Sequence, residues 1–222
     1  MFIVEKQAIS NQVLQYLRKE IMLNKLKDGL HLKESEIAAR LKVSRGPVRE
    51  ALTQLEKENL VKKLPNGRTV VEKFEQKDIE NLYNARILLE KAALAETKHE
   101  NFLKQQSKFE NYIELMGESV EKNEADLAFH ELIIKMSDNK TLLQLWSSLN
   151  GIVLTLMEVT NEYLSMRQRA AIHEHEAIMK KMKQGEVTEA QLALETHLKD
   201  AANHYMNAVK NITLGGVLSN DE

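Results

Sequence analysis

The chain has no cysteine among its 222 residues, which excludes disulfide bonds, cysteine-ligated zinc, iron–sulfur clusters and thiol catalysis. Aromatic residues make up only 5%, and there are 2 prolines and 8 glycines. These are too few turn-forming residues for a sandwich or barrel built from many short strands. The composition therefore favours a mainly helical fold.

Membrane and secretion signals are also missing. No uninterrupted apolar run approaches the ~20 residues that span a bilayer, so we expect no membrane partner. The N-terminal sequence MFIVEKQAISNQ lacks a basic region followed by a long apolar stretch. With 43% hydrophobic and 29% charged residues, the chain is suited to a packed core. We predict a cytoplasmic protein with one large domain or two modest ones.

The charge is distributed unevenly along the chain. Residues 1–73 carry 15 Lys and Arg against 9 Asp and Glu, a net charge of +6, whereas residues 74–222 carry 16 against 24, a net charge of −8. Six of the seven histidines, all except His31, lie in the second part. A basic module joined to an acidic one indicates a polyanionic partner for the first module. Chance clustering of surface charge is the alternative.

The first 73 residues have the pattern of a winged helix-turn-helix. Helical spacing of apolar residues predicts a helix over 7–23 and then a short helix capped by Ser35. A third helix begins at Ser44, carries Pro47 in its first turn and ends near Asn59. Two β-prone runs around the sequence PNGR then predict a hairpin.

The remainder predicts an all-helical bundle of about six helices. No strand candidate of any length follows residue 75, and residues 212–222 lack periodicity and predict a flexible tail. We expect a winged helix-turn-helix domain over 1–73, an all-helical domain over 74–211, and the tail over 212–222. The expected helices are 76–98, 101–121, 124–136, 140–163, 166–183 and 187–210.

The third helix carries donors suited to reading DNA. In a helix-turn-helix this helix enters the major groove with its N-terminal side chains at the base edges. Arg45 and Arg49 can bind guanine O6 and N7 through two hydrogen bonds, and Ser44 can bind a phosphate. Gly46 allows close approach of the backbone. The hairpin, with Gly67 and Arg68, can lie along phosphates or a minor groove.

The string VSRGPVREALTQLEKENLV, followed by the PNG hairpin, closely resembles the DNA-binding domain of the GntR superfamily of bacterial transcription regulators. The resemblance implies DNA contacts by the matching residues Ser44, Arg45, Gly46 and Arg49, and by Gly67 at the tip of the wing. Members often carry an arginine at a further contact position, where this chain has Ser35. We therefore expect one contact at that position to differ from the common pattern.

A second pattern, of metal-ligating residues, lies in the acidic part. Asp126 and His130 are four residues apart, so they lie on one helical face and can chelate one ion. His175 and His197 lie on two later helices joined by a turn at Gly185, which would set the two histidines opposite each other inside a bundle. Spacing alone leaves His173 and His204 open as rival ligands. It also leaves open that these histidines are ordinary core residues.

The strings DLAFHELIIKMSDNKTLLQLWSSL and EHEAIMKKMKQGEVTEAQLALETHL resemble the ligand-binding domain, the FCD domain, of the FadR branch of GntR regulators. The resemblance spans residues 5–210, and the short second domain is similar to the VanR-type subgroup. It implies a divalent metal, zinc first with nickel or manganese as alternatives. The implied ligands are Asp126, His130, His175 and His197.

Arg86 matches a position common in these domains, where its guanidinium can clamp a ligand carboxylate. The alternative is a pair with Glu90 four residues later on the same helix. Trp146, Met157 and Tyr163 can line a pocket, although their helical spacing is typical of core residues.

The function that these patterns indicate is a metabolite-responsive transcription regulator that is not an enzyme. A homodimer would bind an inverted-repeat operator in double-stranded DNA, most simply as a repressor. A small organic acid or sugar acid at the metal would act as effector. The alternatives are a regulator for which the metal itself is the signal, and a metallohydrolase with Glu131 or Glu174 as general base.

Overall fold

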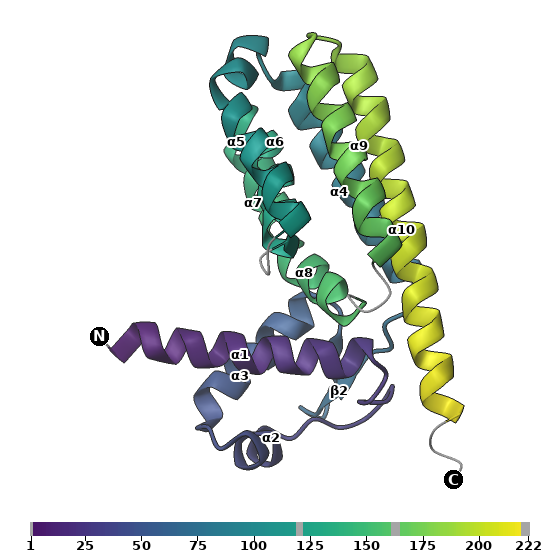
Figure 1. Ribbon diagram of the computed structural model, residues 1–222. Helices are drawn as coiled ribbons and strands as arrows, with labels where there is room; N and C mark the ends of the chain where they lie inside the picture. The colour runs from purple at the N-terminus through teal and green to yellow at the C-terminus, as the bar shows by residue number, and fades with distance from the viewer. Residues whose placement is uncertain (1, 119–121, 161–164, 219–222) are drawn as a thin grey trace. The chain divides into compact units, whose positions relative to one another are not determined.

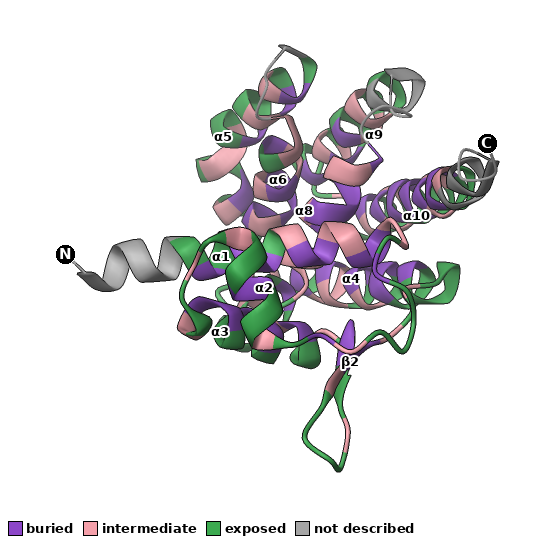
Figure 2. Ribbon diagram, turned by 90° about the horizontal axis from the view of Figure 1, so that it is seen from below, coloured by how far each residue is buried: buried purple, intermediate pink, exposed green. Residues whose placement is uncertain are grey.

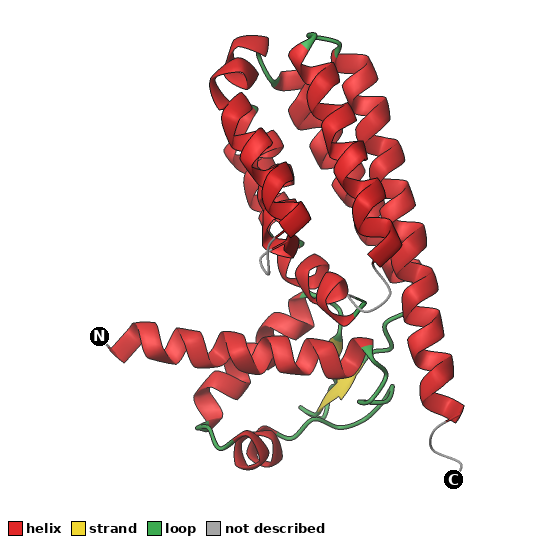
Figure 3. Cartoon of the chain, in the orientation of Figure 1, coloured by secondary structure: helices red, strands yellow, loops and turns green. Residues whose placement is uncertain are grey.

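We describe the chain from a computed structural model that covers residues 2–118, 122–160 and 165–218, with side chains at 9–117, 122–160 and 169–212. Helices dominate, and the described strands form one small hairpin (Figure 3). The chain divides into two compact units, residues 1–75 together with 209–222, and residues 76–208. Each unit is described by itself (Figure 1).

The N-terminal unit has the predicted winged helix-turn-helix fold. Its elements follow the order helix, helix, helix, hairpin. Strands β1 and β2 pair antiparallel with Val61 opposite Val71, and an isolated bridge joins His31 to Val70. The bounds are α1 (Phe2–Met22), α2 (Glu34–Leu41), α3 (Arg45–Lys57), β1 (Val61–Lys63) and β2 (Thr69–Val71).

An apolar core positions the recognition helix α3 in this unit. Val48, Ala51, Leu52 and Leu55 all lie on one face of α3 and are buried against α1 and the hairpin. This packing leaves the opposite face of α3 exposed. A buried ion pair also connects α1 to the end of α3. Arg18 of α1 donates from Nε and Nη2 to the carboxylate of Glu58, at 2.7 and 2.5 Å.

Left-handed backbone conformations shape the turns of the N-terminal unit. Lys42 at the C-terminus of α2 has φ 56°, Asn59 after α3 has φ 57°, and Gly67 in the wing has φ 80°. Asn59 thus ends the recognition helix as predicted. The prediction that Ser35 caps α2 is wrong. Lys33 occupies the cap position, since the helix begins two residues earlier than a cap at Ser35 requires.

The second unit is a helical bundle. Helix α4 runs beside α10, where Lys91 donates to Glu195 at 2.5 Å and Gln191 donates to the carbonyl oxygen of Lys91 at 2.7 Å. Helix α6 packs on α4, α5, α7 and α8. The helices that contribute to the bundle are α4 (Gln76–Glu96), α5 (His99–Glu118), α6 (Lys122–Met136), α7 (Lys140–Ser147), α8 (Asn150–Val159), α9 (Ser165–Lys183) and α10 (Val187–Leu218).

Two boundaries of the bundle differ from the predictions. The helix expected over 140–163 is two helices, α7 and α8, separated at Ser148 and Leu149, so the described bundle has seven helices rather than six. Helix α10 extends to Leu218, into the segment expected to be a tail from residue 212. Extending an existing helix needs no new nucleation step. Each of the two glycines near the end of α10 destabilises the helix by only ~1 kcal/mol, so the helix can continue through them.

The segment Lys140–Val159 is long and apolar enough to cross a membrane by length and composition, with a mean hydropathy of 1.3. Polar residues interrupt the apolar run, so the segment has no continuous apolar stretch of this length. In the structure this segment is not one helix but the pair α7 and α8. Trp146, Val153 and Leu156 from these helices are buried within the bundle. The observation is therefore weak evidence for a membrane helix.

Candidate DNA interface and metal centre

The side chains predicted to read DNA gather at the start of the recognition helix. Arg45 and Arg49 are exposed on α3, Ser44 is exposed directly before it, and Gly46 is half-buried. Ser44 occupies the N-cap position, and within the described residues its hydroxyl makes no capping hydrogen bond. The hydroxyl is thus available to a phosphate oxygen. Ser35 is exposed in the first turn of α2.

The wing presents a second exposed set of donors (Figure 2). Gly67 and Arg68 are exposed at its tip, where the backbone N–H of Gly67 donates to the carbonyl oxygen of Leu64 at 2.9 Å. Asn66 accepts from the backbone N–H of Arg68 at 3.1 Å. The positive φ of Gly67 is one that other residues rarely adopt, so this turn explains the glycine.

The four predicted metal ligands meet inside the bundle. Asp126 and His130 come from α6, His175 from α9 and His197 from α10, and one donor atom of each lies within 4.8 Å of all the others. The Nε2 atom of His130 is 3.3 Å from the Nε2 atoms of both His175 and His197. An Asp126 oxygen lies 3.4 Å from Nε2 of His175. All three imidazoles are buried.

Hydrogen bonds at the far side of each ring fix its orientation. Nδ1 of His130 pairs with Glu90 at 2.6 Å, Nδ1 of His175 with the carbonyl oxygen of Ala171 at 2.7 Å, and Nδ1 of His197 with Glu174 at 2.7 Å. A carbonyl or carboxylate oxygen only accepts, so each Nδ1 carries a proton, and in the neutral imidazole Nε2 then directs a lone pair toward the other rings.

This donor set fits a divalent ion. In the neutral rings the Nε2 lone pair of His130 lies 3.3 Å from those of both His175 and His197, and these lone pairs repel one another unless a cation lies between them. Ligands bound ~2.1 Å from one ion stand roughly 3–4.2 Å apart, so the observed spread needs little contraction. Burial lowers the pKa of His197, which favours the neutral form that a metal requires. Carboxylate partners behind histidine ligands are typical of metal sites.

The rival ligands lie elsewhere. The side chain of His173 is 80% exposed and pairs with Glu176 on the surface, because two residues along a helix turn the side chain to the opposite face. His204 lies two turns beyond His197 against the ring of Tyr205. The bases considered for a hydrolase are also engaged, since Glu131 accepts from Lys135 and Glu174 lies behind His197.

Glu90 joins the metal ligands to Arg86. Its carboxylate is fully buried and accepts from Nε of Arg86 at 3.1 Å, from Nε1 of Trp146 at 2.9 Å and from His130 at 2.6 Å. Burial by itself raises the pKa of Glu90. The interactions of Glu90 with His130, Arg86 and Trp146 outweigh burial, and the pKa falls to about 2. Glu90 therefore remains ionised, and it raises the pKa of Arg86 in return.

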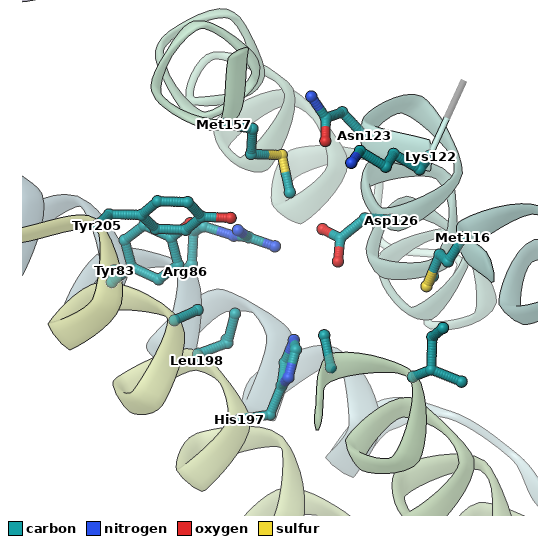
Figure 4. A pocket seen from close by; sticks show the side chains of 13 residues that line it. Tyr83, Arg86, Met116, Lys122, Asn123, Asp126, Met157, His197, Leu198 and Tyr205 are labelled. Atoms are coloured by element: carbon teal, nitrogen blue, oxygen red, sulfur yellow. The ribbon is translucent and has the colours of Figure 1, made fainter. Parts of the chain in front are cut away.

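A pocket of about 590 Å³, partly open to solvent, lies against this centre. Figure 4 shows Arg86, Asp126 and His197 directed into the same space. Arg86 is only 2% exposed, and its Nη2 atom has no hydrogen-bond partner among the residues that the structure describes. The remaining lining residues are Tyr83, Met116, Lys122, Asn123, Met157, Ala171, Ile172, Leu198, Ala201 and Tyr205.

Sequence reasoning anticipated part of this arrangement. Arg86 forms the pair with Glu90 that was the alternative, and it also lines the pocket; its binding of a ligand carboxylate stays a prediction. Met157 lines the pocket, Trp146 is buried at Glu90, and Tyr163 lies outside the described residues. The link from Glu90 to His130, 40 residues away, was missed because no local spacing signals it.

The fold and the exposed recognition helix define a DNA-binding transcription regulator of the winged helix-turn-helix class. Family comparisons agree. Residues 9–71 match the bacterial regulatory proteins of the gntR family, and residues 81–200 match the FCD domain. The chain therefore belongs to the GntR family of transcription regulators and carries an FCD domain. The family and its relatives are regulators, not enzymes, which excludes the hydrolase alternative.

Among similar proteins, the gluconate operon transcriptional repressor of Bacillus subtilis (strain 168) is 31% identical over 75% of this chain and 68% of its own length. A probable D-xylose utilization operon transcriptional repressor of Paenarthrobacter nicotinovorans is 26% identical over 87% of each chain. The crystal structure of a GntR family regulator from Pseudomonas syringae pv. tomato str. DC3000 shares the fold. It has a TM-score of 0.52 and 24% identity, and the match covers 95% of this chain and 90% of that one.

Proposed function

We propose that this protein is a cytoplasmic repressor of the FadR branch, VanR-type subgroup, that releases its operator when a small carboxylate binds in the FCD domain. The observation that carries the proposal is the pocket in which an unpaired N–H of buried Arg86 lies beside the Asp126 and His197 ligands. A buried guanidinium nitrogen without an acceptor favours an anionic ligand.

Asp126, His130, His175 and His197 would hold the divalent ion, for which zinc fits the nitrogen-rich set best and nickel or manganese are alternatives. When bound, the ion supplies a Lewis-acidic coordination position. Asp126 and His197 border the pocket, so a ligand entering it reaches that position. Glu90, Glu174 and the carbonyl oxygen of Ala171 orient the imidazoles.

The effector would be a small organic acid or sugar acid. Its carboxylate would bind Nη2 of Arg86 and the metal position together, and Lys122 and Asn123 at the rim offer polar contacts to hydroxyl groups. The repressor named for the gluconate operon among the relatives supports this class of ligand, because gluconate is a sugar acid. An organic acid with few hydroxyl groups is the alternative.

On DNA, a homodimer would place two recognition helices on an inverted repeat. Ser35, Ser44, Arg45, Gly46, Arg49, Gly67 and Arg68 would form the contact surface. Effector binding would bias two arrangements of the DNA-binding domains. Because the coupling is reciprocal, the effector must bind the DNA complex more weakly than it binds the free protein.

The metal ligands are tested by comparing two histidines on one helix. His175→Ala should strongly lower the metal content of the purified full-length chain after incubation with zinc and removal of free zinc. Two residues earlier, His173→Ala should leave the content at the wild-type level, since His173 is exposed. Elemental analysis measures both variants. Equal metal content in the two would contradict the assigned ligand set.

A further inference from the structure

One acidic residue lies within the basic surface that faces DNA. Glu34, in the first turn of α2, accepts two hydrogen bonds from Arg49 of α3, from Nε to Oε1 and from Nη2 to Oε2, each at 3.0 Å. The Glu34 side chain is 33% exposed and the Arg49 side chain 69%. The pair therefore joins the two helices of the helix-turn-helix at their solvent face.

The pair uses only one edge of the guanidinium. Arginine has five N–H groups, and Glu34 takes one from Nε and one from Nη2. The other edge, formed by Nη1 and the second N–H of Nη2, has no acceptor among the described residues. Two N–H groups on one edge are the arrangement that binds O6 and N7 of guanine. Arg49 can thus keep Glu34 and still read a base.

The surroundings of Glu34 are strongly positive. The hydrogen bond from Arg49 lowers the pKa of Glu34, and the charges of Arg49, Arg45 and Lys63 lower it further against the opposing effect of partial burial. Glu34 in turn raises the pKa of Arg49. The carboxylate is therefore ionised at neutral pH, and it lies among the side chains that would approach phosphates.

We propose that Glu34 is a specificity-determining residue that holds Arg49 by one edge, orients the other edge toward a base, and disfavours DNA of any other sequence. Fixing the arginine in advance removes conformational entropy that would otherwise be lost on binding. The negative charge repels every phosphate backbone equally, so by itself it weakens specific and non-specific binding by the same factor. The oriented edge of Arg49 adds affinity only for a duplex that offers the matching base, and this enlarges the ratio between specific and non-specific affinity.

A competing role for Glu34 makes a different prediction. If Glu34 simply occupied Arg49 until DNA displaced it, removing Glu34 would strengthen binding to every duplex by the same factor. If Glu34 instead orients Arg49, removing Glu34 should lower the ratio of specific to non-specific affinity. The loss of Glu34 would then strengthen binding to unrelated DNA and leave binding to the operator unimproved or weaker.

The experiment measures full-length chain binding to two duplexes by fluorescence anisotropy. One duplex is selected by the wild type from a random pool, and the other has the same length and composition in scrambled order. Glu34→Ala should lower the ratio of the two affinities about tenfold, within the range expected when a two-hydrogen-bond base contact is impaired. Glu34→Gln, which keeps an acceptor oxygen, should give an intermediate ratio.

Two further variants separate orientation from charge. Glu36→Ala removes the same charge from the same turn of α2, but its partner is Lys33 rather than Arg49, so the ratio should stay within about twofold of wild type. In an Arg49→Ala background, Glu34→Ala should change the ratio no further. Two results would overturn the proposal. One is that Glu34→Ala and Glu36→Ala give the same ratio of specific to non-specific affinity. The other is that Glu34→Ala lowers this ratio as much in the Arg49→Ala background as it does in the wild type.

Discussion

The two units of the molecule each carry an arginine–glutamate pair at the site of their chemistry, but in opposite environments. On the DNA-binding unit, Arg49 and Glu34 are 69% and 33% exposed. In the bundle, Arg86 and Glu90 are 2% and 0% exposed. Either member of the exposed pair can be removed at little cost in stability because water screens the charge that remains, whereas the buried pair cannot lose a member without leaving an uncompensated charge.

The difference matches the two kinds of ligand. DNA is a large partner that covers the recognition helix from outside, so the groups that meet it lie at the surface. The proposed effector is small and is enclosed by the bundle, so Arg86 is oriented in advance by Glu90, while its Nη2 atom has no partner among the described residues. Glu90 also contacts His130, which ties the guanidinium to the metal ligands.

Breaking the buried pair should produce the largest effect on stability. Glu90→Ala leaves Arg86 charged in the core and removes the acceptors of His130 and Trp146, so we expect a loss of ~3–5 kcal/mol in the free energy of unfolding. Urea unfolding followed by the fluorescence of Trp146, the single tryptophan, measures it in metal-free protein.

The matched change in the exposed pair is Glu34→Ala, which should leave the unfolding midpoint unchanged within error. A Glu90→Ala loss below ~1 kcal/mol would mean that Arg86 finds another partner or water. The contrast between the two units would then disappear.

The smallest expected effect on stability concerns the turn at the C-terminus of α2 in the DNA-binding unit. Lys42 adopts φ 56° and ψ 40°, a left-handed conformation that glycine populates without strain. We expect Lys42→Gly to stabilise the N-terminal unit by ~0.5–1 kcal/mol. As a control, Ala39→Gly inside α2 should destabilise it by ~1 kcal/mol. Destabilisation by Lys42→Gly, measured by thermal unfolding, would contradict this interpretation of the turn.

Local signals accounted for much of what the sequence predicted correctly. Apolar spacing located the helices, and the left-handed residues Asn59 and Gly185 lie at the expected helix ends. Asn139 directly precedes the helix expected from residue 140, and it caps α7 by accepting from two backbone N–H groups at 3.1 Å. These features depend on neighbours within a few residues, so a single sequence contains enough information to predict them.

Features that depend on distant packing were missed. The contacts of Glu90 with His130 and of Glu34 with Arg49 join residues 40 and 15 positions apart, and no periodicity marks them. The choice of His175 over His173 rested on resemblance, because helical spacing fixes which residues share a face but not which face meets a neighbouring helix. The break between α7 and α8 at Ser148 has no proline or glycine before it to signal it.

The central proposal is that a carboxylate held by Arg86 beside the metal ligands controls DNA binding. The most direct measurement is the affinity of the zinc-loaded full-length chain for its selected duplex, with and without a panel of small carboxylates beginning with gluconate. We predict that at least one carboxylate weakens DNA binding 5- to 150-fold. We also predict that this weakening is lost in Arg86→Met and after chelation of zinc. The proposal would be contradicted if no carboxylate changed the DNA affinity, or if a carboxylate changed it equally in the absence of Arg86 and zinc.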